Sequence, residues 1–277
     1  MNYRHIFHAG NFTEVVKHCV LTLIIDYLRK KETPFCVMDS HAGEGIYDLT
    51  SPEAEKTGEA AAGIRRIIKD DAHHPQCMQS YLQILKPFQT GGQLTHYPGS
   101  PWFAYQMLRP QDCLVLNELH PETNRRLKQN FSGKPQVAIH QRDAYELLPA
   151  ILPPPVARGV VLIDSPFEQK DESEKIQQLL AKCLKRWAHG IYIVWYPITT
   201  ARSWNVQTLT LQNAIERYLI VELTIAAQGP NAKGLLGCQL LIVNPPWQLA
   251  DTLNGLLKYL WEIFSLGHQG GWVVKTS

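Results

Sequence analysis

Short apolar runs alternate with amphipathic stretches along most of the chain, and this alternation predicts strands and helices in turn. The predicted strands are residues 35–39, 113–117, 137–140, 159–164 and 191–195. The predicted helices are 11–30, 100–108, two that start at Pro121 and Ala144, about 173–187 and about 206–218. Asn11, with Glu14 three residues later, has the spacing of a helix start. Strands that alternate with helices are typical of a mostly parallel sheet covered by helices.

Two stretches depart from this rhythm. Residues 47–92 contain a polar loop and two helical segments, 60–69 and 78–85, so we expect a helical insertion there. Residues 220–226 and 239–244, joined by a Gly-rich loop, predict an antiparallel hairpin. Five strand–helix units closed by a hairpin are the order of the Rossmann-like methyltransferase fold. We therefore expect one α/β domain over residues 1–277, with a mostly parallel, seven-stranded sheet.

Composition narrows the class of protein only slightly. The 277 residues are 45% hydrophobic, which is enough for a packed core. A formal net charge of +2 neither requires nor excludes a nucleic-acid partner. The six cysteines are scattered without a CxxC spacing, which favours reduced thiols in the cytoplasm over disulfides or a zinc site. The N-terminus has no signal-peptide pattern, and the apolar run 20–25 is too short to span a bilayer. We expect no membrane and no obligate protein partner.

Acidic residues follow four consecutive predicted strands. They are Asp39, Glu118, Asp143 and Asp164. Ligands of open parallel sheets bind outside the carboxyl ends of the strands, and a carboxylate there needs hydrogen-bond donors. An adenosyl group supplies such donors, from the ribose hydroxyls to Glu118 and from the adenine amine to Asp143. Any one of these residues could instead be an ordinary helix N-cap, as Asp143 before Ala144 could be.

The turn after the first strand reads His41-Ala-Gly43-Glu-Gly45. Its glycines allow a ligand to approach the backbone closely. A dinucleotide site needs a third glycine and a helix that starts at once, and neither is present. No GxxxxGK[ST] motif occurs either. A cofactor without pyrophosphate therefore fits better, and we expect S-adenosylmethionine.

The fourth strand ends in Asp164-Ser165-Pro166-Phe167, which resembles the [DN]-P-P-[YFW] motif of methyltransferases that act on exocyclic amines. The amine of adenine is a poor nucleophile because its lone pair is delocalised into the ring. The Asp164 carboxylate and the Ser165 carbonyl can each accept one amine hydrogen, which aims the lone pair at the sulfonium methyl group. Phe167 would stack on the extruded base.

Asn244-Pro-Pro-Trp247 matches the same motif more literally. It follows a strand predicted to run antiparallel, so we expect Asn244 at the opposite edge of the sheet. We interpret this segment as a strand end terminated by prolines.

The N-terminal segment carries His5 and His8, and Lys17 and His18 follow on the first helix. Two neighbouring histidines raise the question of a metal, but no carboxylate or thiolate lies at a suitable spacing, so we predict none. We favour a segment that faces RNA or covers the cofactor, with His5 in contact with substrate; structural packing is the alternative.

Together these residues resemble a known family. The segments YRHIFHAGNFTEVVKH, DSHAGEGIYDL, YPGSP, NELHP, LIDSPF and IVNPPW, in order from residue 3 to 247, are similar to the bacterial 23S ribosomal RNA adenine-N6 methyltransferases of the J type. The resemblance implies methyl transfer to adenine N6 of protein-free large-subunit rRNA, with Asp164 as the catalytic acceptor and Tyr3 in contact with RNA. It also implies a cofactor site lined by Lys17 or His18, His41, Ser100, Glu118, Asp143, Ala144 and Asp164.

The chain departs from the family at the motif itself. Ser165 stands where the family has proline, and Phe167 where it usually has tyrosine. Proline would fix φ and restrict the preceding residue, so rigidity is lost. Two alternatives remain: a DNA adenine-N6 methyltransferase, or a catalytically weak nucleic-acid-binding relative that takes part in the use of external DNA. The sequence shows no separate DNA-reading domain outside the insertion, which favours an RNA target recognised by shape.

Overall fold

The structure, a computed structural model, describes residues 5–70, 74–200, 215–226 and 234–277. After a short 3-10 helix, η1 (His5–Phe7), the five parallel strands that the hydrophobic pattern predicts occur in the predicted order. None of the described helices combines the length and the apolar character that a membrane span requires.

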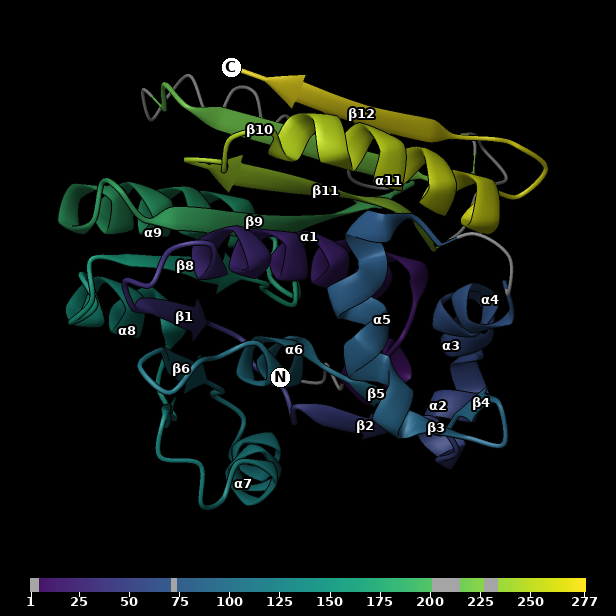
Figure 1. The fold of residues 1–277 in the computed structure, drawn as a ribbon, viewed down its shortest axis with the longest axis horizontal. Coiled ribbons are helices and arrows are strands. Elements are labelled where there is room, and N and C mark those ends of the chain that lie inside the picture. The colour runs from purple at the N-terminus through teal and green to yellow at the C-terminus, as the bar shows by residue number, and fades with distance from the viewer. Residues whose placement is uncertain (1–4, 71–73, 201–214, 227–233) are drawn as a thin grey trace.

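The main sheet has eight strands among the described residues, in the order β12-β10-β11-β9-β8-β1-β6-β7 (Figure 1). Five neighbouring strands are parallel: β1 (Phe35–Asp39), β6 (Cys113–Asn117), β7 (Val137–His140), β8 (Arg158–Ile163) and β9 (Ile191–Thr199). β11 (Leu235–Val243) is antiparallel to β9 and to β10 (Tyr218–Thr224), and β12 (Gly271–Thr276) is antiparallel to β10. The predicted Rossmann-like α/β fold and hairpin are confirmed.

Three details of the prediction are corrected or left open. The sheet is one strand wider than expected, because β12 pairs with β10 at the edge. The sequence patterns also missed α11 (Leu249–Phe264), which packs beside this strand. The helix expected at 206–218 lies mainly outside the described residues, and its last residue, Tyr218, begins β10 instead.

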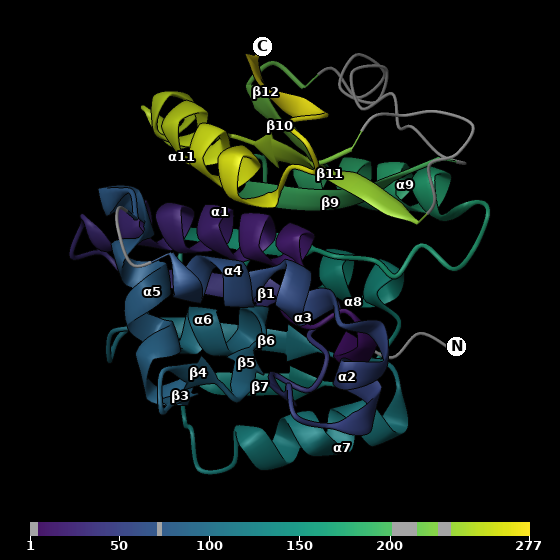
Figure 2. The ribbon, with the colours of Figure 1, turned by 90° about the vertical axis from the view of Figure 1, so that its right-hand side faces the viewer.

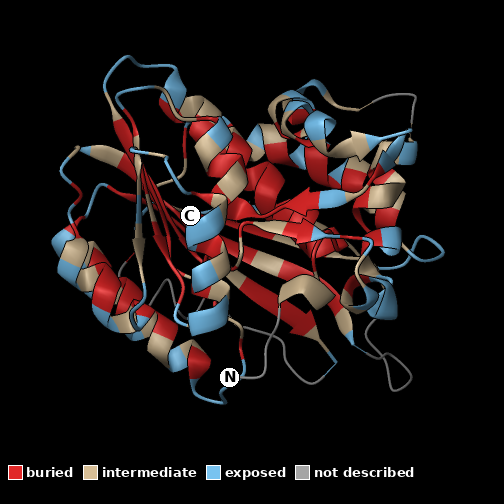
Figure 3. Ribbon diagram, turned by 90° about the horizontal axis from the view of Figure 1, so that it is seen from below, coloured by how far each residue is buried: buried red, intermediate tan, exposed pale blue. Residues whose placement is uncertain are grey.

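Helices cover both faces of the sheet (Figure 2). One face packs against α1 (Phe12–Arg29), α6 (Ser100–Gln106), α7 (Pro121–Asn130) and α11, and the other against α8 (Ala144–Ile151) and α9 (Glu172–Arg186). Side chains alternate along β8, where Leu162 contributes to the first core and Ile163 to the second. Figure 3 shows the central strands mostly buried, as expected for a parallel sheet with two covered faces, whereas the edge strands β7 and β12 contain no buried residue.

Residues 47–92 hold a group of short elements that lie together beside α1 (Figure 1). They are α2 (Pro52–Thr57), α3 (Glu59–Ala62), α4 (Ile64–Lys69), η2 (Gln76–Met78), α5 (Gln79–Leu85), η3 (Lys86–Phe88) and β3 (Gln89–Thr90). Short strands border the group: β2 (Ile46–Asp48) pairs with β5 (His96–Pro98), and β3 pairs with β4 (Gln93–Leu94). The helix predicted at 78–85 is confirmed as α5, but the one predicted at 60–69 is divided into α3 and α4 at Gly63, and α2 lies in the stretch predicted as a polar loop. That residues 47–92 form an inserted subdomain stays a prediction.

The strand order creates a crevice between β1 and β8. The chain runs from β1 to β6 and β7 on one side of the sheet, and then from β8 to β9 on the other side. Helices that leave β1 and β8 therefore diverge, and ligands of such sheets bind where the order reverses. Asp39 ends β1 and Asp164 directly follows β8, so two of the four predicted acidic residues lie at this point.

Candidate active site

A cavity of about 240 Å³ opens at the carboxyl ends of the central strands. Its lining includes seven residues that the sequence predicts for the site: His5, His41, Gly43, Glu118, Asp143, Ala144 and Asp164. These residues come from η1, the turn after β1, and the ends of β6, β7 and β8. The structure thus gathers residues that are up to 159 positions apart: sheet topology brings the strand ends together, and η1 adds His5.

The glycine turn and the end of β6 are joined by one carboxylate. Glu118 accepts hydrogen bonds from the Gly43 N–H at 2.9 Å and from the His120 N–H at 2.8 Å. Gly43 has a φ of +62°, and a Cβ atom there would lie 2.0 Å from the Tyr47 hydroxyl. Only glycine fits this position. The turn therefore brings its backbone against the cavity with no side chain in between.

Asp143 and His41 both line the cavity, Asp143 as a helix-capping carboxylate and His41 as a neutral imidazole. The Asp143 carboxylate caps α8, accepting from the Tyr145 N–H at 2.7 Å, so the helix-cap interpretation is correct for this residue. The same residue also faces the cavity. His41 Nδ1 lies 2.7 Å from the Ser40 hydroxyl. Burial lowers the pKa of His41, so its imidazole is neutral at pH 7.

Ser100 lies outside this cavity, beneath the glycine turn. Its hydroxyl donates to Asp39 at 2.6 Å, and the other carboxylate oxygen of Asp39 accepts from the His41 N–H at 3.2 Å. Burial raises the pKa of Asp39 to about 6, although the bond from Ser100 opposes that rise. The observed contacts make Ser100 a support for the turn, and its predicted place in the cofactor lining is not supported.

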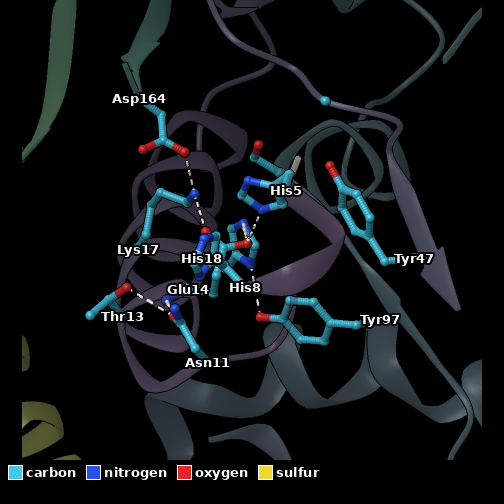
Figure 4. Close-up of polar contacts among 12 residues, drawn as sticks. His5, His8, Asn11, Thr13, Glu14, Lys17, His18, Tyr47, Tyr97 and Asp164 are labelled. Atoms are coloured by element: carbon cyan, nitrogen blue, oxygen red, sulfur yellow. Dashed lines mark hydrogen bonds and ion pairs between the residues drawn. The ribbon is translucent and has the colours of Figure 1, made fainter. Parts of the chain in front are cut away.

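Lys17 lies between two carboxylates in the most buried part of the site (Figure 4). Its ammonium group forms ion pairs with Asp164 and with Glu14, and its side chain is 2% exposed. His5 Nε2 lies 2.7 Å from the other oxygen of Glu14. A chain of contacts therefore runs from His5 through Glu14 and Lys17 to the Asp164 carboxylate, with alternating formal charge.

The charges in this chain support one another. Burial raises the pKa of Glu14, but His5 and Lys17 outweigh burial and hold it well below its usual range. Burial lowers the pKa of Lys17, but Asp164 and Glu14 outweigh burial and raise it above its ordinary value. The pKa of His5 is raised as well, because Glu14 overcomes the effect of burial. Lys17 thus remains a cation next to Asp164 at neutral pH.

His18 belongs to the core instead of the cavity. Its Nδ1 lies 2.8 Å from the Tyr97 hydroxyl, and its ring centroid lies 4.8 Å from that of Phe103. Burial lowers its pKa to about 3, so the ring is neutral. Of the two residues named as alternatives for the cofactor site, the structure brings Lys17 to Asp164 and keeps His18 away.

A second cavity of about 300 Å³ lies on the other side of Asp164. Ser165, Pro166 and Trp195 line it together with Asp164. Phe167 is not among the described residues that line either cavity. It is 8% exposed and has a φ of +52°, and its ring packs 5.9 Å from Trp195 and 5.6 Å from Tyr196. The predicted stacking role of Phe167 is therefore not supported by its placement.

The second Pro-Pro motif lies at the opposite edge of the sheet, as the topology predicts. Val243 is paired with Tyr192 near the start of β9, so Asn244 emerges where the parallel strands begin. The Asn244 amide donates to the carbonyls of Ala188 and Gly190 at 2.9 and 2.8 Å. It closes the turn before β9 and does not line either of the two cavities at Asp164.

Among the residues in the two cavities, the sequence analysis missed Glu14, Tyr145, Glu172 and Trp195 as functional candidates. Glu14 was recognised only as part of a helix start, and its N–H does bond to the Asn11 side chain at 2.8 Å. Nothing in the spacing of Tyr145 and Glu172 signals that α8 and α9 bring them together. Tyr3, predicted to contact RNA, lies outside the described residues.

A family model and two known proteins that match this chain all carry the name of one ribosomal RNA methyltransferase family. The family model described as "Ribosomal RNA large subunit methyltransferase D, RlmJ" matches residues 32–276. The chain is 38% identical to the Escherichia coli protein named ribosomal RNA large subunit methyltransferase J, over 94% of this chain and 92% of that protein. It is 36% identical to the Haemophilus influenzae protein of the same name, over 99% of this chain and 98% of that protein.

A solved structure agrees over the whole fold. The crystal structure of protein LPL1258 from Legionella pneumophila superposes with a TM-score of 0.86 at 31% identity, covering 98% of each chain. Because the family model and both relatives match nearly the full length, the chain belongs to the ribosomal RNA large subunit methyltransferase J family.

Proposed function

We propose that this protein transfers a methyl group from S-adenosylmethionine to N6 of an adenine in large-subunit ribosomal RNA. The proposal rests on the position of Asp164, which lines both cavities. A carboxylate between two adjoining cavities can touch a cofactor on one side and an acceptor base on the other. The names of the two relatives support ribosomal RNA as the substrate class.

The first cavity suits an adenosyl cofactor. Glu118 and Asp143 offer carboxylate oxygens for the ribose hydroxyls and the adenine amine, and Gly43 leaves room at the backbone. His41 would contribute a neutral ring. When bound, S-adenosylmethionine supplies an electrophilic sulfonium methyl group. The protein needs only to position the acceptor and exclude water, which agrees with a site made of fixed polar groups.

The acceptor amine would be held at Asp164. Lys17 pairs with Oδ2 of this residue, so Oδ1 would accept one amine hydrogen. The Ser165 carbonyl would accept the other. Both bonds draw the amine lone pair out of conjugation and direct it toward the first cavity. The methylated amine then loses one proton, which the Asp164 carboxylate that accepts its hydrogen bond would take up and release to solvent, while Lys17 stays protonated.

We propose that Trp195, and not Phe167, stacks on the acceptor base. It lines the second cavity, whereas Phe167 is covered by Trp195 and Tyr196. An extruded adenine in this cavity would stack on the indole, which is sequence-tolerant and stabilises flipped bases by about 1–3 kcal/mol. We further propose that the substrate rRNA is free of ribosomal proteins and that Tyr3 contacts it. Residues 47–92 would form an inserted subdomain that binds the rRNA. The enzyme would act in the cytoplasm.

The test is competition between substrates. Labelled methyl groups from S-adenosylmethionine should enter protein-free 23S rRNA, and an excess of duplex DNA should not compete. Incorporation into DNA at a comparable rate would instead support a DNA adenine methyltransferase. Binding of both nucleic acids with no transfer, and no heat of binding for S-adenosylhomocysteine, would contradict the proposed activity.

A further inference from the structure

Ser165 is held by a buried carboxylate that comes from another element. Its hydroxyl donates to Oε1 of Glu172, the first residue of α9. The Tyr145 hydroxyl, from the first turn of α8, donates to the same oxygen and lies 3.4 Å from the Ser165 hydroxyl. Ser165 and Glu172 are 1% and 5% exposed, so the contact is shielded from water.

The physical setting makes this contact strong. A carboxylate at the first position of a helix is stabilised by the unpaired N–H groups and the dipole there. Hydrogen bonds to a charged acceptor are about twice as strong as those between neutral groups. Burial and the bond to Glu172 raise the pKa of Tyr145, so its hydroxyl keeps its proton and remains a donor.

The contact lies at the one position where the motif lacks its usual proline. Proline at 165 would fix its own φ and restrict Asp164 before it. Serine imposes neither restriction. Pro166 restricts the backbone of Ser165 but not that of Asp164, so Asp164 needs another constraint. No hydrogen bond from the Ser165 N–H occurs in the described part of the chain, so the main chain itself does not supply one. Two residues later, Phe167 is anchored in the core.

We propose that Glu172 and Tyr145 are positioning residues that replace the missing proline. Acting through the Ser165 hydroxyl, they hold residues 164–166 so that the Asp164 carboxylate and the Ser165 carbonyl face the acceptor amine. This inference rests on the proposed methyl transfer. Glu172 and Tyr145 also line the cofactor cavity, so a direct effect on the cofactor is the rival explanation that the experiment must exclude.

A double-mutant cycle separates the two explanations. Glu172→Gln should lower the single-turnover rate of methyl transfer, at saturating cofactor, about tenfold, because small displacements of a reacting group cost that much or more. In the Ser165→Pro background the same change should cost less than about twofold, since proline then supplies the constraint. Tyr145→Phe should give a smaller loss with the same dependence on background. An equal loss in both backgrounds would overturn the proposal.

Two further variants control for nonspecific effects of mutating α9 and for misfolding of Ser165→Pro. Glu174→Gln, exposed on the same helix, should stay within about twofold of the native rate. If Ser165→Pro does not fold, Ser165→Ala replaces it: this variant should match Glu172→Gln, and the double variant should be no slower. Additive losses would overturn the positioning role. If the native protein transfers no methyl group to rRNA in the same assay, the proposed function fails and the inference with it.

Discussion

The ammonium group of Lys17, in the second turn of α1, is paired with the carboxylate of Asp164, which follows β8. The two residues are 147 positions apart and are brought together by the packing of α1 across the sheet. Asp164 is 11% exposed and Lys17 2%, so neither charge is well solvated. The ion pair thus fixes the position of the carboxylate on which the proposed chemistry depends.

Removing the Lys17 cation should destabilise the fold. Lys17→Met leaves the carboxylates of Glu14 and Asp164 buried without their shared partner, and breaking a buried ion pair costs about 3–5 kcal/mol. Urea denaturation should show this loss of unfolding free energy. Lys30→Met, at the exposed end of the same helix, should change it by less than about 1 kcal/mol. Equal stabilities of the two variants would contradict the burial of the pair.

Stability below pH 6.5 should depend on His18. Its pKa is about 3 in the folded protein and near 6.5 when unfolded, so only the unfolded state takes up a proton as the pH falls through this window. This contribution is fully present above pH 6.5 and is lost toward pH 3, by about 1.4 kcal/mol per pH unit. Between pH 7 and 5 the native protein should lose about 2 kcal/mol more than His18→Gln. Denaturant titrations that give both proteins the same pH dependence would refute the prediction.

Gly43 should be required for cofactor binding. Gly43→Ala places a methyl group 2.0 Å from the Tyr47 hydroxyl and moves the backbone at the cavity wall. We expect the affinity for S-adenosylhomocysteine, measured by calorimetry, to fall at least about tenfold, or about 1.4 kcal/mol. Gly91→Ala is the matched control, because Gly91 also has a positive φ, of +58°, but has open space at its Cβ. Similar losses in both variants would mean that backbone strain alone, and not the cradle, is responsible.

The sequence was sufficient for most of the fold and for the acidic residues at the strand ends. Their identification depended on a rule of sheet topology, and the rule applied: Glu118, Asp143 and Asp164 line one cavity. Topology also predicted that Asn244, the better motif match, lies at the opposite edge of the sheet, and the structure confirms that position. At the chain end, α11 was predictable, because its buried residues recur at helical spacing: Leu249, Leu253, Leu256, Leu257, Leu260 and Phe264. β12 was not, because nothing in residues 271–276 distinguishes an edge strand from a tail until its partner, β10, is known.

Side-chain direction could not be predicted in the same way. Phe167 belongs to a motif whose aromatic residue is expected to stack on a base, yet the chain turns at a φ of +52° and buries the ring. Glu14 carries the signature of a helix start, but its carboxylate bonds to His5 and Lys17. These outcomes depend on which neighbours tertiary packing supplies, and the spacing along the chain does not contain that information.

The Asn244 variant tests whether the two motifs differ in function. Asn244→Gly keeps a residue suited to the φ of +53° but removes the amide that bonds to Ala188 and Gly190. The unfolding free energy should fall by about 1–3 kcal/mol, while methyl transfer at 25 °C stays within about twofold of native. A loss of transfer as large as that of an Asp164 variant, in a protein that remains folded, would show that the wrong motif was assigned.

The most direct test of the account is the nucleoside product itself. Protein-free 23S rRNA, treated with the native protein and S-adenosylmethionine and then digested, should contain new N6-methyladenosine by mass spectrometry. Asp164→Ala should reduce its yield by about a hundredfold or more, while calorimetry still detects S-adenosylhomocysteine binding. A different methylated nucleoside, or undiminished N6-methyladenosine from a folded Asp164→Ala variant, would contradict the central role of Asp164.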